Sequence, residues 1–442
     1  MLETRIDGVE IPSESNPLSA AYAKVSWRLI PILFVCNAVA YLDRVNIGFA
    51  KLAMQSDLQF SDLVYGLGAG IFFTSYLLFE IPVNMIVFKA GARRSIATIM
   101  IVWGIASGSM MFIRSPASFY VLRFLLGAAE SGFLPAAILY LTGWYPAQRR
   151  GKVIALFMAA IPASSAVGSA LSGWILQELS GWMGFAGWQW LFVLEALPST
   201  LMGVLVLLFL PDRIALAPWL RSPEKLALQS MLDSPSASTE KHGLKQVLLS
   251  AQVWRLGLVY FCLGTGLYVV GFWMPTIIKA SGVVGPMNTG LLTAIPYVGA
   301  LIGMIALGHH SDKVGERRWH VAAPVLLAAF GIIFGTVFGN HTVLAMLGLT
   351  IGTTGIISAV PVFWGLSTAN LRGAGAAVAI ALINAIGNVA GIVSTVLVGW
   401  ITQVTHSTNA SMFALATVLA LGAAQVLTLS AGRNQPGSHA SH

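Results

Sequence analysis

The sequence GHHSDKVGERR, residues 308–318, resembles an earlier stretch of the chain, NMIVFKAGARR, residues 84–94. Both stretches carry a lysine, a glycine two residues later, and then a pair of arginines. The aspartate at position 312 has no counterpart in the first copy, where Phe88 stands. A loop that recurs once in each half of a chain indicates two parallel structural repeats. We therefore expect two halves of similar architecture.

The amino-acid composition indicates whether these halves fold in water or in a membrane. The 442 residues are 56% hydrophobic and only 10% charged, with a mean hydropathy of +0.78. A soluble domain has about 25% charged residues, so this chain needs a bilayer around it. Twelve apolar runs are separated by polar or Gly/Pro breaks, six on each side of a polar segment, 211–246. The prediction is an all-α membrane protein with 12 transmembrane helices in two pseudo-symmetric six-helix halves.

The distribution of charge predicts the orientation of these helices. Most of the 25 lysines and arginines fall in alternate loops, which places those loops and both termini in the cytoplasm. Lys51, Arg114 and Lys279 are then expected outside. The net charge of +8 therefore reflects topology, and no soluble basic face is left for a nucleic acid. The expected segments are a cytoplasmic tail (1–25), the first half (26–210), a linker with a short amphipathic helix (211–250), the second half (251–431) and a cytoplasmic tail (432–442).

Five stretches carry a family resemblance: YLDRVNIGFA (41–50), LFEIPVN (78–84), LRFLLGAAESGFLPAAILYLTGWYP (122–146), GWQWLFVLEALPS (187–199) and INAIGN (383–388). In these stretches the chain resembles the major facilitator superfamily, and within it the anion:cation symporter family. It looks most like bacterial permeases for 4-hydroxyphenylacetate, phthalate, tartrate and sugar acids. The resemblance implies proton-coupled import of a small organic anion across the bacterial inner membrane. It also implies that Asp43, Arg44, Arg123 and Glu130 serve coupling and binding, and that Tyr41 and Tyr76 line the site.

The residues themselves point to the same region. Charged side chains are costly at membrane depth, where they are most often functional. All of those found here belong to the first half: Asp43, Glu80, Glu130, Glu195, Arg44 and Arg123. Arg123 and Glu130, seven residues apart, share a helix face but lie about 10 Å apart along the axis, too far to pair directly. Asp43 is therefore expected to engage Arg123 and Glu130, while Arg44 faces the substrate or a neighbouring helix.

Coulomb's law suggests how such a cluster couples protons to an anion. An anion that binds an arginine withdraws that cation from a neighbouring carboxylate and adds a like charge. At an effective dielectric near 20, a unit charge at 4 Å is worth about 4 kcal/mol, enough to favour protonation of the acid. We therefore expect Asp43 and Glu130 to carry protons and Arg44 and Arg123 to bind a carboxylate. The alternative is a structural ion-pair cluster that ties two helices together.

The second half offers neutral groups, and the loops offer candidate gates. Amide and aromatic side chains can contact an organic acid or simply join helices. The expected substrate contacts from this half are Asn384, Trp364, Tyr297 and Trp273. The expected gating residues are Glu80 and the loop residues Arg93, Arg94, Asp312, Arg317 and Arg318. Glu195 is expected to have a packing or intrahelical hydrogen-bonding role, and His309 and His310 to be solvated.

These patterns favour a secondary active transporter that works by alternating access, with protons and a small organic anion as its partners. An anion exchanger or a drug-type exporter is the alternative within transport. A membrane sensor would need an output domain, for which the linker is too short and polar. No Walker loop, HExxH motif or Ser/His/Asp set is present, so an enzyme is disfavoured, and no catalytic residue, metal or cofactor is expected. The chain is expected to act as a monomer.

Overall fold

The computed structural model describes residues 17–232, 247–370 and 376–429. All regular elements within these ranges are helices, and 12 of the spans are long and apolar enough to cross a membrane. The predicted number and type of transmembrane elements are therefore confirmed. The expected tail 432–442, most of the tail 1–25 and part of the linker 211–250 lie outside the described residues.

Six spans form the first half, and short breaks divide two of them into consecutive helices. Their bounds are α1 Pro17–Leu58, α2 Asp62–Ala90, α3 Ala92–Gly108, α4 Pro116–Glu130 with α5 Phe133–Thr142, α6 Ala147–Met158 with α7 Ala160–Glu178, and α8 Gly187–Phe209. The break between α4 and α5 falls at Ser131 and Gly132, directly after Glu130. The carboxyl group therefore lies where the helix is interrupted.

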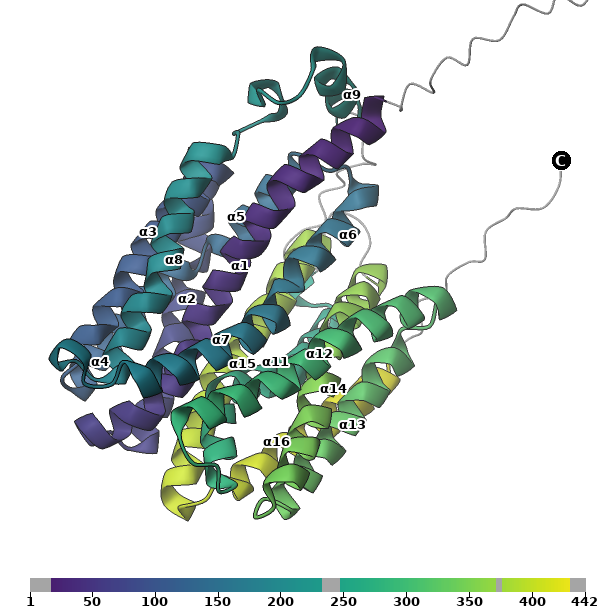
Figure 1. Cartoon of the computed structure of the whole chain (residues 1–442). Coiled ribbons are helices and arrows are strands. Elements are labelled where there is room, and N and C mark those ends of the chain that lie inside the picture. Colours follow the sequence, from purple (N-terminus) through teal and green to yellow (C-terminus); the bar gives the residue numbers. More distant parts are fainter. Residues whose placement is uncertain (1–16, 233–246, 371–375, 430–442) are drawn as a thin grey trace, which may run out of the picture.

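The other six spans form the second half, and a short helix, α9, precedes them. Their bounds are α9 Ser222–Leu232, α11 Ala251–Ala280, α12 Pro286–Val314, α13 Arg318–Val337, α14 Thr342–Asn370, α15 Ala376–Thr405 and α16 Asn409–Leu427. Figure 1 shows the purple-to-teal helices of the first half and the green-to-yellow helices of the second as two groups. The expected amphipathic helix of the linker is α9, which packs Leu228 inward and lies against α1.

Within the described residues, the two halves meet mainly where α2 packs on α15, α7 on α12, and α1 on α11. Glycines allow the closest approaches. A Cβ atom at Gly66 would lie 2.6 Å from the Thr395 carbonyl oxygen, and one at Gly173 would lie 2.7 Å from that of Pro286. Both contacts lie at the end of the bundle where α1 finishes and α12 begins. This end is therefore closed by backbone-to-backbone packing between the halves.

Candidate functional site

An ion pair between Arg44 and Glu130 joins α1 to α4 in the interior of the first half. The Arg44 Nε donates to the Glu130 carboxylate at 3.0 Å, and Nη2 donates to the same oxygen. Glu130 is 3% exposed. The guanidinium carbon of Arg44 lies 5.4 Å from the centre of the Tyr76 ring, so the expected aromatic neighbour is present. A buried carboxylate is thereby paired, as the low dielectric of the interior requires.

Arg123 has a less complete set of partners. The side chain is fully buried, and its Nε donates to the Gly68 carbonyl oxygen at 3.2 Å. Both terminal nitrogens, Nη1 and Nη2, lack a hydrogen-bond partner among the described residues. Buried donors are nearly always satisfied, and an unpaired buried charge is costly. The two free donors of this guanidinium therefore offer an anion a bidentate site.

Phe72 lies against both arginines and was not identified from the sequence. The guanidinium carbon of Arg123 is 4.6 Å from the centre of the Phe72 ring, and that of Arg44 is 5.6 Å from it. The ring face therefore stabilises two buried cations. Phe72 precedes Tyr76 by four residues on α2, so the two share a helix face. That spacing is the signal by which the sequence could have identified Phe72.

Asp43 lies in a different environment from the one expected. Its carboxylate accepts hydrogen bonds from Trp103 Nε1 at 2.8 Å, from Ser107 Oγ at 3.1 Å, and from Ser199 Oγ. No ion pair between Asp43 and an arginine occurs within the described ranges. The expectation that Asp43 engages Arg123 and Glu130 was wrong, since it faces α3 and α8, while its neighbour Arg44 takes Glu130. The roughly 100° between adjacent helix positions explains the separation.

The four neutral residues expected from the second half lie on four different helices, α11, α12, α14 and α15. Asn384 on α15 donates to the Glu80 carboxylate on α2 at 3.4 Å, and so bridges the two halves. Trp364 on α14 packs edge-on against Tyr260, with the two ring centres 4.9 Å apart. Tyr297 and Tyr41 are both buried, at 3% and 6% exposure. Glu80, expected as a gating residue, therefore has an amide partner in the other half, and it lies about three turns before the end of α2.

Lys51, expected in an outer loop, lies instead inside a helix. It lies within α1 with 1% exposure, and its Nζ is 2.8 Å from an Asp62 carboxylate oxygen. The same Nζ lies 3.8 Å from the centre of the Trp273 ring and 3.3 Å from Thr276 Oγ1, both on α11. Trp273, expected as a substrate contact, is fully buried beneath this lysine. These residues belong to the closed end, where they connect the two halves.

The basic turns bind helix ends, as their charge predicts. Arg93 donates to the Leu207 carbonyl oxygen near the end of α8, and Arg318 donates to the Leu427 carbonyl oxygen at the end of α16, at 2.7 Å. Arg317 lies 3.7 Å from Asp312 and donates to the Gly365 carbonyl oxygen.

In the first turn, which lacks the aspartate, Arg93 instead pairs with Asp212 at 2.9 Å. Arg94 is exposed.

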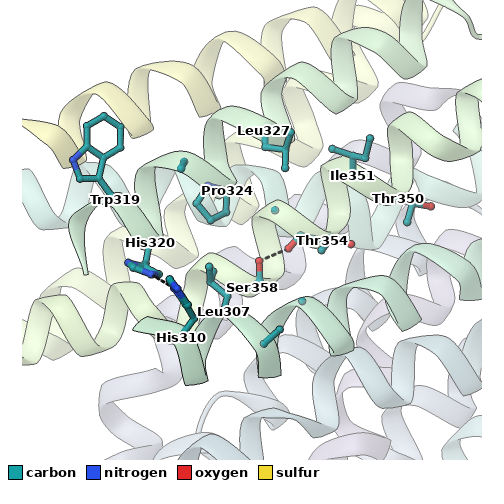
Figure 2. A pocket seen from close by; sticks show the side chains of 14 residues that line it. Leu307, His310, Trp319, His320, Pro324, Leu327, Thr350, Ile351, Thr354 and Ser358 are labelled. Atoms are coloured by element: carbon teal, nitrogen blue, oxygen red, sulfur yellow. Dashed lines mark hydrogen bonds between the residues drawn. The ribbon is translucent and has the colours of Figure 1, made fainter. Parts of the chain in front are cut away.

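A cavity of about 750 Å³ lies apart from these charges, between α12, α13 and α14. Figure 2 shows Thr350, Ile351, Thr354 and Ser358 of α14 along one side, with His310 and His320 at one end. The His310 Nδ1 and His320 Nε2 atoms are 2.7 Å apart. The lining contains no carboxylate or guanidinium group, so the cavity is separate from the charged site. Across the described ranges, no cluster of three His, Cys, Asp or Glu residues could hold a metal ion.

Comparisons with known proteins agree with this architecture. The sequence model of the Major Facilitator Superfamily matches residues 33–395. A protein of Pseudomonas putida named as a metabolite transporter, NicT, is 45% identical over 93% of this chain and 95% of its own length. One from Agrobacterium vitis named as a tartrate transporter is 44% identical over 98% and 95%. A quinolone resistance transporter of Acinetobacter baumannii is 36% identical over 90% and 92%.

Among solved structures, the fold matches a bacterial homolog of the human lysosomal transporter Spinster in an inward-facing, unoccupied conformation. The TM-score is 0.74 at 16% sequence identity, and the match covers 93% of this chain and 96% of that chain. At this identity the match concerns the fold alone.

Proposed function

This chain belongs to the Major Facilitator Superfamily, and we propose that it is a proton-coupled symporter that imports a small organic carboxylate. The family and the relatives make it a transporter and not an enzyme. The proposal adds the substrate class, the coupling ion, the direction and a location in the bacterial inner membrane. We further propose that the two halves act as the moving units of alternating access.

The observation that supports the proposal most directly is that Arg123 is buried with unpaired hydrogen-bond donors. A fully buried guanidinium with two unpaired terminal nitrogens needs an anion, and a carboxylate accepts two parallel hydrogen bonds from it. The guanidinium carbon also lies 5.9 Å from the centre of the Phe272 ring on α11. An anion bound at Arg123 is thus close to the boundary between the halves, where a transporter must bind its substrate.

Coupling follows from the Arg44–Glu130 pair. A substrate carboxylate near Arg44 competes with Glu130 for the same guanidinium. At an effective dielectric near 20, the field of a unit charge at 4 Å is worth about 4 kcal/mol, which favours protonation of the displaced glutamate. Protonation of Glu130 then frees Arg44 for the substrate, so proton and anion bind together. Asp43 is the second proposed proton carrier.

The relatives support a carboxylate substrate. The name of the Agrobacterium vitis relative refers to tartrate, which is a hydroxylated dicarboxylate. Asn384 and Trp364 are proposed to contact the hydroxyl or apolar part of the substrate from the second half. Tyr41, Tyr76 and Tyr297 supply further contacts.

The test is uptake by the purified protein in proteoliposomes. An inward proton gradient is expected to drive accumulation of tartrate or another small organic acid, and a protonophore is expected to abolish accumulation while leaving exchange intact. Replacing Arg123 with Ala is expected to abolish binding of the acid in a thermal-shift assay. Accumulation that persists after collapse of the gradient would rule out proton coupling.

A second candidate, drug export, rests on the quinolone resistance relative. Quinolones carry a carboxylate, so Arg123 would serve as their binding group as well. The same proteoliposomes distinguish the two functions. Export predicts movement of a quinolone against an oppositely directed proton gradient, whereas symport predicts that acid and protons move in the same direction.

A further inference from the structure

Glu195 is a buried carboxyl group that the mechanism above does not use. It lies on α8 with 1% exposure. Its Oε1 accepts a hydrogen bond from Ser172 Oγ on α7 at 2.6 Å. This bond joins two helices, whereas packing or a hydrogen bond within one helix was expected. The other oxygen, Oε2, has no partner among the described residues. A carboxyl group with an unpaired oxygen at membrane depth calls for a functional explanation.

The surroundings of Glu195 oppose a negative charge. No lysine, arginine or histidine in the described ranges forms an ion pair with it. The ionisable group that acts on it is Asp43 on the neighbouring helix α1, and a negative charge there would oppose one on Glu195. An isolated buried carboxylate is costly enough that the group takes up a proton instead. The environment therefore favours Glu195 as a neutral acid.

Asp43 is equally buried, at 2% exposure, but has more hydrogen-bond donors. Its two oxygens accept three hydrogen bonds, from Trp103, Ser107 and Ser199. Donors of this kind stabilise the ionised form of a carboxyl group. Two neighbouring acids in unlike environments form a pair in which one holds a proton and the other holds a charge.

The two acids lie at the interface of α1 and α8. Ser199, which donates to Asp43, follows Glu195 by four residues and so lies one turn along the same face of α8. Asn46, three residues after Asp43 on α1, lies close enough for its side-chain amide to act on the Glu195 carboxyl group, and its Nδ2 makes no other hydrogen bond among the described residues. The interface therefore places a second donor, besides Ser172, next to Glu195.

We propose that Glu195 is a further proton-carrying residue of the transport cycle, sharing one transported proton with Asp43. When the proton leaves the Glu195 oxygen, it forms an O–H bond on Asp43, Glu195 becomes the carboxylate, and the pair keeps its single negative charge. The donors to Asp43 come from α3 and α8. A shift of these helices therefore changes which of the two acids holds the proton. This inference rests on the proposed proton coupling.

The test replaces Glu195 with Gln, which keeps the shape and an acceptor for Ser172 but cannot exchange a proton. Proteoliposomes are loaded with tartrate or whichever acid supports uptake. We expect proton-driven accumulation to fall at least tenfold, while counterflow at equal pH stays within twofold of the parent. Glu178→Gln, at the exposed end of α7, is the matched control and is expected to change neither. Unchanged accumulation, or a parallel loss of accumulation and counterflow, would overturn the proposal.

An infrared measurement separates this inference from the proposed function. The purified parent at neutral pH is expected to show the carbonyl band of a protonated carboxyl group that Glu195→Gln lacks. If that band is present but the parent shows no proton-driven uptake, proton coupling is wrong while the protonated state of Glu195 stands. If Glu195→Gln leaves the band unchanged, Glu195 is ionised and the shared proton is ruled out.

Discussion

The ammonium group of Lys51 lies 3.8 Å from the centre of the Trp273 ring, and this contact joins the two halves at their closed end. Asp62, 2.8 Å away, supplies the countercharge from α2. A desolvated cation over an indole ring is worth about 2 kcal/mol. Since Lys51 and Asp62 belong to the first half and Trp273 to the second, opening this end requires the cation to leave the ring.

Replacing Lys51 with Ala is therefore expected to shift the protein toward conformations open at this end. A reporter cysteine at Thr395, which is fully buried beside Gly66, measures the shift through its rate of alkylation. A loss of about 2 kcal/mol corresponds to roughly a 30-fold faster reaction.

Lys279→Ala is the control, because Lys279 belongs to the same end of α11 but is exposed. It is expected to leave the alkylation rate unchanged. Equal rates in the parent and Lys51→Ala would show that the lysine does not hold this end closed.

Replacing Arg123 with Lys tests the geometry of the proposed anion site. Lysine keeps the charge but cannot present two parallel donors to a carboxylate. A hydrogen bond to a charged group contributes about 1.5–3 kcal/mol, so the affinity for an organic acid is expected to fall at least tenfold. Calorimetric titration with tartrate measures the change, and an unaltered affinity would refute the bidentate site.

Replacing Phe72 with Leu tests the aromatic support of the two arginines. The substitution removes the ring face but keeps an apolar side chain at the site. A cation–ring contact is worth about 0.5–2 kcal/mol depending on how far it is desolvated, so substrate affinity is expected to fall at least several-fold. Phe79→Leu is the control, since Phe79 is 39% exposed on the same helix, and the affinities are compared by titration. Equal losses in the two variants would point to a general packing defect.

Glu224 gives a pH-dependent contact between α9 and α1. The hydrogen bond from Lys24 Nζ, 2.6 Å long, and one from the Arg221 backbone N–H lower the pKa of Glu224 below its usual value. A lowered pKa in the folded state means that the contact stabilises docking above about pH 4.3 and is lost as the pH falls below that value. Hydrogen exchange in residues 222–232, corrected for intrinsic rates, should therefore accelerate on acidification.

Replacing Glu224 with Gln provides the comparison. Its exchange should be faster than the parent's at neutral pH and should change little between neutral and acidic conditions. The effect is expected to be small, because Lys24 is 39% exposed and water screens the pair.

Hydropathy predicted the twelve spans because each must be apolar over about 20 residues, and the positions of Arg44, Arg123 and Glu130 stood out against that background. The partners of these groups were less predictable. They depend on the rotation of each helix about its axis, which packing between distant segments determines. Asp43 accordingly faces Trp103 on α3. Nothing in the sequence distinguishes Trp103 from other aromatic residues of the core.

Lys51 was assigned to a loop for a related reason. The sequence marks the end of an apolar run by its first charge, but α1 continues for seven residues beyond Lys51. A lysine whose partners, Asp62 and Trp273, lie on two other helices can remain buried. Nothing local in the sequence distinguishes it from an interfacial lysine, so its role in joining the halves needed the structure.

The Arg44–Glu130 pair yields the most direct test of coupling. Glu130→Gln removes the negative charge and keeps the side-chain volume, so Arg44 is left free for the substrate carboxylate. We expect the affinity for the acid to stay the same or increase, and exchange to continue, because both arginines remain. Accumulation driven by a proton gradient is expected to disappear, since the variant has no carboxylate at this position to protonate.

Arg44→Ala is the complementary change. It leaves Glu130 buried without its cation, which costs about 3–5 kcal/mol when one partner of a buried pair is removed. Glu130 is then expected to remain protonated, so both binding and accumulation should weaken. If Glu130→Gln still accumulates substrate on a proton gradient, the pair is structural, and coupling resides with Asp43 and Glu195.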